Sequence, residues 1–167
     1  MTGKKGRAAD TIVTGWHCLE DYRDLSKRRL CSVVSGTQAP KHREAYRLAD
    51  GGGMHADWAI LRLKLPVEAS LTRALLVHPA RADPARSITM AGYSRDAELG
   101  DHGERLTFDP ACLITTAEPT VSDSNCTAHK GASGGAVVQL SESGAPLFSG
   151  SVRCSRCRGA AWERCSQ

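Results

Sequence analysis

The sequence predicts an all-β protein of the sandwich or barrel kind. Short runs of strand-forming residues alternate with clear turn signals, at about the spacing that such folds use. The 3.6-residue periodicity of long helices is not found over the 167 residues. Aromatic residues make up only 5% of the chain, so the core must be built mainly from valine, leucine, isoleucine and alanine.

Ten segments are predicted to form strands, five in each half of the chain. Those in the first half span residues 11–14, 30–35, 45–48, 58–63 and 74–77. Those in the second half span residues 87–91, 105–108, 112–116, 136–140 and 147–152. Glycine and proline mark the breaks between them, at 36–40, 51–53, 79–84, 98–103 and 141–146. A short helical turn is expected within residues 19–30.

Residues 79–86, which contain two prolines and several small residues, are the best candidate for a linker between two halves. The predicted organisation is a basic N-terminal tail (1–10), a first half (11–78), this linker, a second half (87–152) and a tail rich in arginine and cysteine (153–167). The length suits one ordinary domain or two very small ones.

The net charge of +4 is concentrated at the two ends of the chain. Residues 1–10 hold three basic side chains against one acidic, and residues 153–167 hold four arginines against one glutamate. The part between them is nearly neutral, which argues against a nucleic-acid-binding face. No apolar run reaches the roughly 18 residues that span a bilayer. We therefore expect neither nucleic acid nor a membrane as a partner.

Seven cysteines are many for a chain of this length and indicate an oxidising compartment. The basic start of the chain has no apolar segment behind it, so it is not a secretory signal. The odd number of cysteines leaves at least one thiol without an internal partner. These observations are explained if the chain is an incomplete copy of a secreted or periplasmic domain whose signal peptide was lost with its N-terminus.

A glycine-rich segment around Ser133 is the most informative local motif, with the sequence G-A-S-G-G at residues 131–135. Such glycines let the backbone turn sharply, expose the hydroxyl and aim backbone N–H groups at one point, as an oxyanion hole requires. The alternative interpretation is an ordinary glycine-rich turn. The nucleophile elbow of α/β-hydrolases is rejected because its acid and histidine follow the serine, whereas no aspartate or histidine follows Ser133.

His17 and Asp57 precede Ser133, in the order of another hydrolytic triad. His17 ends a β-branched run, and Asp57 stands at the mouth of an apolar strand, where a buried acid needs a partner. An imidazole N–H is a suitable partner, and the pair would fix the tautomer in which the histidine acts as a base. Taken singly, His17 is also compatible with a structural histidine and Asp57 with a strand-cap acid. Three such contexts in one order rarely coincide by chance.

Three motifs together resemble the trypsin-like serine peptidases of the chymotrypsin fold. T-G-W-H-C at 14–18 is similar to their T-A-A-H-C, D-W-A-I-L-R-L at 57–63 to their D-I-A-L-L-x-L, and G-A-S-G-G-A-V-V at 131–138 to their G-D-S-G-G-P-L-V. The resemblance extends over residues 11–152 and suits the compact bacterial members. It implies two antiparallel β-barrels with the site in the cleft between them, the first barrel (11–78) being incomplete and the second at 87–152.

The resemblance also implies a role for each motif residue. Ser133 would be the nucleophile, His17 its general base and Asp57 the acid that orients His17. The backbone N–H groups of Gly131 and Ser133 would form the oxyanion hole. The implied function is a serine endopeptidase that hydrolyses protein or peptide substrates through an acyl-enzyme, without a cofactor or a metal. The alternative is a catalytically inert, peptidase-like binding module.

Thr127, His129 and Lys130 are the expected substrate-pocket residues. Thr127 lies six residues before the nucleophile, where the family often has the base of its primary pocket. Because threonine is uncharged, it argues against a strict preference for arginine or lysine in the substrate. His129 and Lys130 would instead favour acidic side chains.

Similar bacterial sequences carry a cysteine pair like Cys112 and Cys126, which implies a disulfide; the alternative is two buried thiols. Cys18 has no earlier cysteine to pair with, and Cys31 would be an unusual partner. The tail offers too few ligands for a four-coordinate zinc site, because it lacks histidine and has only three cysteines. These are Cys154, Cys157 and Cys165.

Four departures from the family's pattern shape the expectations. After the predicted strand at 147–152 the composition changes abruptly to arginine and cysteine, so the chain is expected to stop before the family's last strand and C-terminal helix. Ala132 stands where activated zymogens have an aspartate, so that activation device is not expected here. Arg153 replaces the serine that often supports the catalytic aspartate. The chain also begins almost at the His17 strand, so the first barrel is expected to lack a strand or two. An otherwise monomeric protein would then associate through the exposed edge at 11–14.

Overall fold

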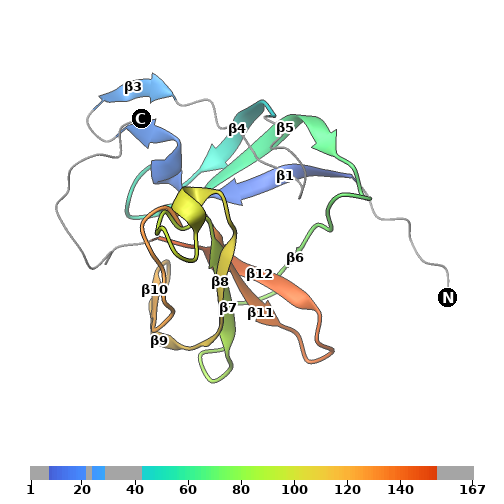
Figure 1. The fold of residues 1–167 in the computed structure, drawn as a ribbon, viewed down its shortest axis with the longest axis vertical. Helices are drawn as coiled ribbons and strands as arrows, with labels where there is room; N and C mark the ends of the chain where they lie inside the picture. Colours follow the sequence, from blue (N-terminus) through green and yellow to red (C-terminus); the bar gives the residue numbers. More distant parts are fainter. Residues whose placement is uncertain (1–7, 22–23, 29–42, 154–167) are drawn as a thin grey trace.

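The computed structural model describes residues 8–21, 24–28 and 43–153. Their regular structure consists of β-strands and two short 3-10 turns, η1 (Trp16–Cys18) and η2 (Asp101–Gly103). The prediction of an all-β protein is therefore confirmed. None of the described segments forms a helix with the length and apolar character needed to cross a membrane. Figure 1 shows the strands gathered into an N-terminal and a C-terminal group.

The N-terminal group is an antiparallel sheet with β5 at its centre. Its strands, in spatial order, are β1 (Ala9–Thr14), β5 (Ala59–Val67) and β4 (Ala45–Asp50). Side chains alternate between the faces of a strand, and Ala59, Leu61 and Leu63 are buried on one face of β5. Leu19 packs against this face, which is the local core. Among the described residues β1 pairs with β5 alone, and the association predicted for its other edge stays a prediction.

Part of the segment expected to hold a helical turn forms strands instead. β2 (Glu20–Asp21) and β3 (Asp24–Arg28) pair with each other as a short antiparallel hairpin. Between Glu20 and Arg28 the only aliphatic residue is Leu25, so a helix here would have no apolar stripe to bury. Pairing of the two strands satisfies their backbone N–H and C=O groups and does not need an apolar stripe. The strand predicted at 30–35 lies outside the described residues.

The C-terminal group is a five-stranded sheet in which β11 lies at the centre. In spatial order its strands are β6 (Leu76–Val77), β12 (Pro146–Ser151), β11 (Ala136–Leu140), β7 (Ile88–Gly92) and β8 (Thr107–Cys112). A separate hairpin joins β9 (Ile114–Ala117) to β10 (Ser122–Ser124), a strand that was not predicted. β8 continues past its predicted end at 108 because Pro110 lies at an irregularity of the β7–β8 ladder, where a missing N–H is tolerated.

A disulfide joins Cys112, at the end of β8, to Cys126, seven residues before Ser133, as predicted. The two Cα atoms are 4.9 Å apart, inside the range that this bond requires. The bond fixes the segment that leads into the glycine-rich loop around Ser133 (residues 131–135, the serine loop) against the edge of the C-terminal sheet.

Replacing both Cys112 and Cys126 by serine is expected to lower the free energy of unfolding by about 3 kcal/mol, because the loop they close is freed in the unfolded chain. Urea denaturation of the oxidised parent and the double variant measures the difference. Non-reduced digests of the parent should contain the two peptides linked. Alkylation of both thiols without prior reduction would contradict the assignment.

Candidate active site

The adjacent ends of β1 and β5 bring His17 and Asp57 together. The strands are antiparallel, and Thr14 pairs with Ala59 where the ladder ends. His17 lies just beyond β1 in η1, and Asp57 lies just before β5. Since an antiparallel pair places the exit of one strand beside the entry of the other, two residues 40 positions apart become neighbours.

Both carboxylate oxygens of Asp57 contact His17. Oδ2 lies 2.7 Å from Nδ1 of the ring, and Oδ1 accepts the main-chain N–H of His17 at 3.0 Å. An ionised carboxylate only accepts hydrogen bonds, so Nδ1 carries the proton. The Asp57 side chain is 6% exposed, and a charge-assisted bond in such a site is strong. The pair predicted from the sequence order is therefore formed, with Nε2 directed away from the carboxylate.

Gly15 leaves room for this ring. A Cβ at Gly15 would lie 3.1 Å from Nδ1 and Cε1 of His17 and 3.5 Å from Oδ1 of Asp57. The first two separations are tighter than ordinary van der Waals contact, so an alanine here would push against the imidazole. Glycine at this position of T-G-W-H-C therefore lets the imidazole lie close to the backbone.

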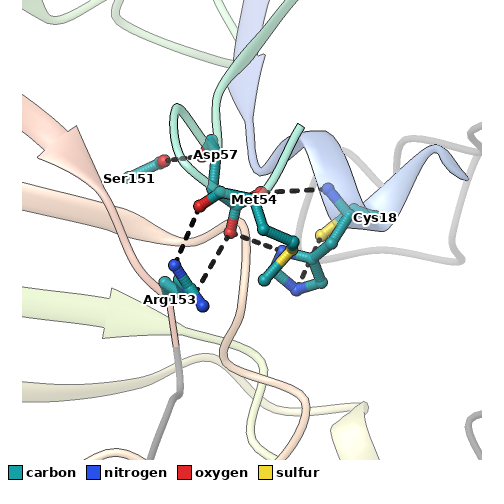
Figure 2. A network of polar contacts seen from close by, with 6 residues as sticks. Cys18, Met54, Asp57, Ser151 and Arg153 are labelled. Carbon is teal, nitrogen blue, oxygen red and sulfur yellow. Dashed lines mark hydrogen bonds and ion pairs between the residues drawn. The ribbon is translucent and has the colours of Figure 1, made fainter. Parts of the chain in front are cut away.

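The Cys18 thiol is a contact that the sequence reasoning missed. Its Sγ lies 3.8 Å from Nε2 of His17, on the opposite side of the ring from Asp57. Figure 2 shows Cys18 and Asp57 in one network of polar contacts. Within the described part of the chain the thiol is not in a disulfide. The sequence contained a signal for this contact, because Cys18 follows His17 directly and has no earlier cysteine with which to form a disulfide.

The pKa of His17 is raised above its ordinary value of 6.5. The hydrogen bond to Cys18 is the largest cause, charge interactions with Cys18 and Asp57 add to it, and burial of the ring opposes it. His17 therefore keeps its proton to higher pH, and the neutral form needed by a general base appears only as pH rises through this pKa. The same contacts stabilise the fold below about pH 6.5, and that contribution is lost as pH rises through the folded-state pKa.

Replacing Cys18 by alanine is expected to lower the pKa of His17, because the largest raising contact is removed. The acidic limb of the kcat/KM profile should then move to lower pH, and an NMR titration of the His17 ring should show the same direction. Cys18→Ser, which keeps a hydrogen-bonding group, serves as the matched control and should shift less. Identical His17 titrations in the parent and Cys18→Ala would contradict the account.

The serine loop packs directly on the His17 turn. Gly134 has a φ of 80°, and a Cβ built on it would lie 2.4 Å from Thr14 Oγ1 and 3.0 Å from Cys18 Sγ. Only glycine permits both the left-handed backbone and this approach. Ser133, the neighbour of Gly134, is half-buried. The structure thus brings the loop that carries the predicted nucleophile against the turn that carries the predicted base.

Gly131 begins the serine loop with a second left-handed conformation, at a φ of 100°. A Cβ on Gly131 would lie 2.7 Å from the main-chain oxygen of Tyr93, so the loop also packs closely on the segment after β7. Ala132 is buried at 3% exposure, in the place where the resembled motif has an aspartate. Its N–H donates to the His129 carbonyl at 3.1 Å, and its own carbonyl accepts the N–H of Gly135 at 3.0 Å. These two hydrogen bonds fix the backbone conformation of the serine loop.

A cavity of about 330 Å³ lies beside Ala132 in the C-terminal half. Of the predicted pocket residues it includes Thr127 and His129, whereas Lys130 is not among its lining residues. Its other walls are apolar, hydroxyl and acidic side chains together with backbone. The lining residues are Met90, Gly92, Ser94, Asp96, Leu99, Thr107, Phe108, Asp109, Pro110, Thr127, Ala128, His129 and Ala132.

Two of these residues, Asp96 and Asp109, are carboxylates that the sequence reasoning did not single out. Oδ2 of Asp109 accepts the N–H of Thr127 at 2.8 Å and so fixes the backbone at the predicted base of the pocket. The N–H of Leu99, then that of Gly100, hold the pKa of Asp96 below its ordinary value, helped by the nearby His129. The cavity therefore combines one imidazole with two acids.

Comparison with solved structures identifies the architecture. The chain matches a Glu endopeptidase structure with a TM-score of 0.58 at 15% identity, over 83% of this chain and 67% of the other. It matches kallikrein-related peptidase 10 with a TM-score of 0.53 at 17% identity, over 87% and 78% of the two chains. No protein-family model and no curated protein matches the sequence. The likeness shows that this chain has the chymotrypsin-like serine peptidase fold.

Proposed function

We propose that this protein is a serine endopeptidase in which Ser133 is the nucleophile. The observation that supports this most directly is the bond of 2.7 Å between Nδ1 of His17 and Asp57, in a turn on which the serine loop packs. An imidazole oriented by a buried carboxylate, with its second nitrogen facing away, is the arrangement that activates a hydroxyl.

The proposed reaction follows from these three residues. Ser133 Oγ attacks the peptide carbonyl while Nε2 of His17 accepts its proton, and Asp57 stabilises the imidazolium. The tetrahedral intermediate collapses when His17 gives the proton to the leaving amine, which breaks the C–N bond and leaves an acyl-enzyme. Water then attacks the ester carbonyl while His17 accepts its proton, and His17 returns that proton to Ser133 Oγ as the acyl C–O bond breaks, which releases the acid. No cofactor or metal enters this scheme.

The N–H groups of Gly131 and Ser133 are the proposed donors to the developing oxyanion. The left-handed conformation of Gly131 turns the backbone sharply just before the nucleophile, which is what convergent N–H groups require. The proposed substrates are proteins or peptides. Because His129 shares its cavity with Asp96 and Asp109, the acidic preference expected from His129 and Lys130 is opposed by two carboxylates. The disulfide supports a secreted or periplasmic location, which is proposed here together with a monomeric state.

An active-site-directed peptidyl phosphonate tests the proposal against an inert binding module. The serine peptidase should become covalently labelled, with the added mass mapped to Ser133, and the label should be lost in His17→Ala. Ser122→Ala, a change in the exposed β9–β10 hairpin, is the matched control and should label normally. Folded protein that is not labelled at all would support the inert module.

A further inference from the structure

The last residue of β12, Ser151, and the residue after it, Val152, are bonded to both halves of the candidate site. The N–H of Val152 donates to the Gly135 carbonyl at 2.9 Å, and the Val152 carbonyl accepts the N–H of Gly134 at 2.8 Å. One residue earlier, the Ser151 hydroxyl donates to the main-chain carbonyl of Asp57 at 3.4 Å. Residues 151–152 therefore bind the serine loop through Val152 and the Met54–Asp57 loop through Ser151.

Arg153 extends this connection with a cation. Its Nη1 donates to the main-chain carbonyl of Met54 at 2.9 Å, and its Nε lies 4.0 Å from Oδ2 of Asp57, as Figure 2 shows. The Arg153 side chain is 40% exposed and that of Asp57 is 6% exposed. The guanidinium thus joins a buried carboxylate of the N-terminal half to a strand end of the C-terminal half.

The chemistry of the guanidinium suits this double contact. It is planar and carries several N–H donors in a fixed fork, so one nitrogen can bind a carbonyl while another faces a carboxylate. The serine that the resembled family often has at this position is too short to reach both Met54 and Asp57. The oxygen that Arg153 approaches, Oδ2, is also the one bonded to Nδ1 of His17.

We propose that Arg153 is a positioning residue that clamps the Met54–Asp57 loop to the C-terminal half and so holds Oδ2 of Asp57 in line with Nδ1 of His17. Its effect on turnover rests on the proposed peptidase function. The clamp itself is a property of the fold, and it can be measured without any substrate.

The test compares Arg153→Met, which removes both contacts, with Arg153→Lys and Arg153→Gln. The first readout is the downfield proton NMR signal of the His17 Nδ1–H, which reports its bond to Asp57. In Arg153→Met this signal should move upfield or broaden away, and kcat should fall about 10- to 100-fold, the range expected when a base is displaced by about 1 Å. KM should stay within about twofold, because the substrate contacts are intact.

Arg153→Lys should recover part of both losses, since it keeps a cation near Oδ2, and Arg153→Gln should recover less. Arg81→Met is the matched control, because Arg81 also donates to main-chain carbonyls, those of Glu118 and Pro119, and has no contact with Asp57. An unchanged Nδ1–H signal in folded Arg153→Met or Arg153→Gln would overturn the proposal. If the parent resists phosphonate labelling while its Nδ1–H signal depends on Arg153, the peptidase function fails and the clamp stands.

Discussion

Replacing Ser133 by alanine is expected to lower kcat for peptide hydrolysis by about a million-fold, and His17→Ala should lower it about as far. The two residues act in one step, since the hydroxyl is a nucleophile only while the imidazole takes its proton. KM should change little, because the interaction that is lost belongs to the transition state. Release of p-nitroaniline from a set of peptide p-nitroanilides measures both constants.

The double variant carrying both substitutions is the sharper test of this cooperation. If Ser133 and His17 act as a unit, the double variant should be about as slow as either single variant. Multiplied losses would mean that the two residues act independently. Activity of Ser133→Ala close to that of the parent would show that another group attacks the substrate. The Cys18 thiol lies near Nε2, and measuring the activity of Cys18→Ala shows whether this thiol is that other group.

Asp57→Asn is expected to lower kcat by about ten-thousand-fold without unfolding the protein. An asparagine amide can donate a hydrogen bond to Nδ1, which places the imidazole proton on Nε2. In that tautomer Nε2 cannot accept the proton of Ser133. Turnover and the thermal midpoint are measured together, since the buried amide still satisfies its hydrogen bonds and the midpoint should move by only a few degrees.

Asp10→Asn is the matched control for this substitution. Asp10 lies on β1 of the same sheet and pairs with Arg62 at 2.8 Å, away from His17. Its replacement should leave kcat within about twofold, as expected for a partly exposed ion pair. A loss in Asp10→Asn as large as that in Asp57→Asn would assign the effect to the sheet and not to the His17 bond.

The sequence predicted the part of the site that depends on local motifs. His17 follows one apolar, strand-forming run and Asp57 precedes another, so antiparallel pairing of the two runs must bring these flanking residues together. Gly131 and Gly134 could likewise be anticipated, since sharp turns next to a packed neighbour require glycine. The strands themselves were recognisable because their apolar residues alternate or cluster between turn signals.

The parts that were missed depend on contacts between distant segments or on weak local signals. Asp96 lies in the segment that follows β7 and Asp109 lies in β8, and only the folding of the C-terminal sheet places both in the cavity with His129. The contact of Arg153 with Met54 links residues 99 positions apart, and no local pattern reports it. The β2–β3 hairpin lacked the alternating apolar pattern by which strands are recognised, since its residues are mostly charged.

The separation between Ser133 Oγ and His17 Nε2 in a crystal structure of this protein tests the central claim most directly. The account predicts that the hydroxyl lies within hydrogen-bond reach of Nε2, at roughly 2.6–3.2 Å and somewhat longer without substrate, with the ring between Ser133 and Asp57. A separation of more than about 8 Å, with Nε2 facing only Cys18, lies far outside the reach of a general base and would contradict it.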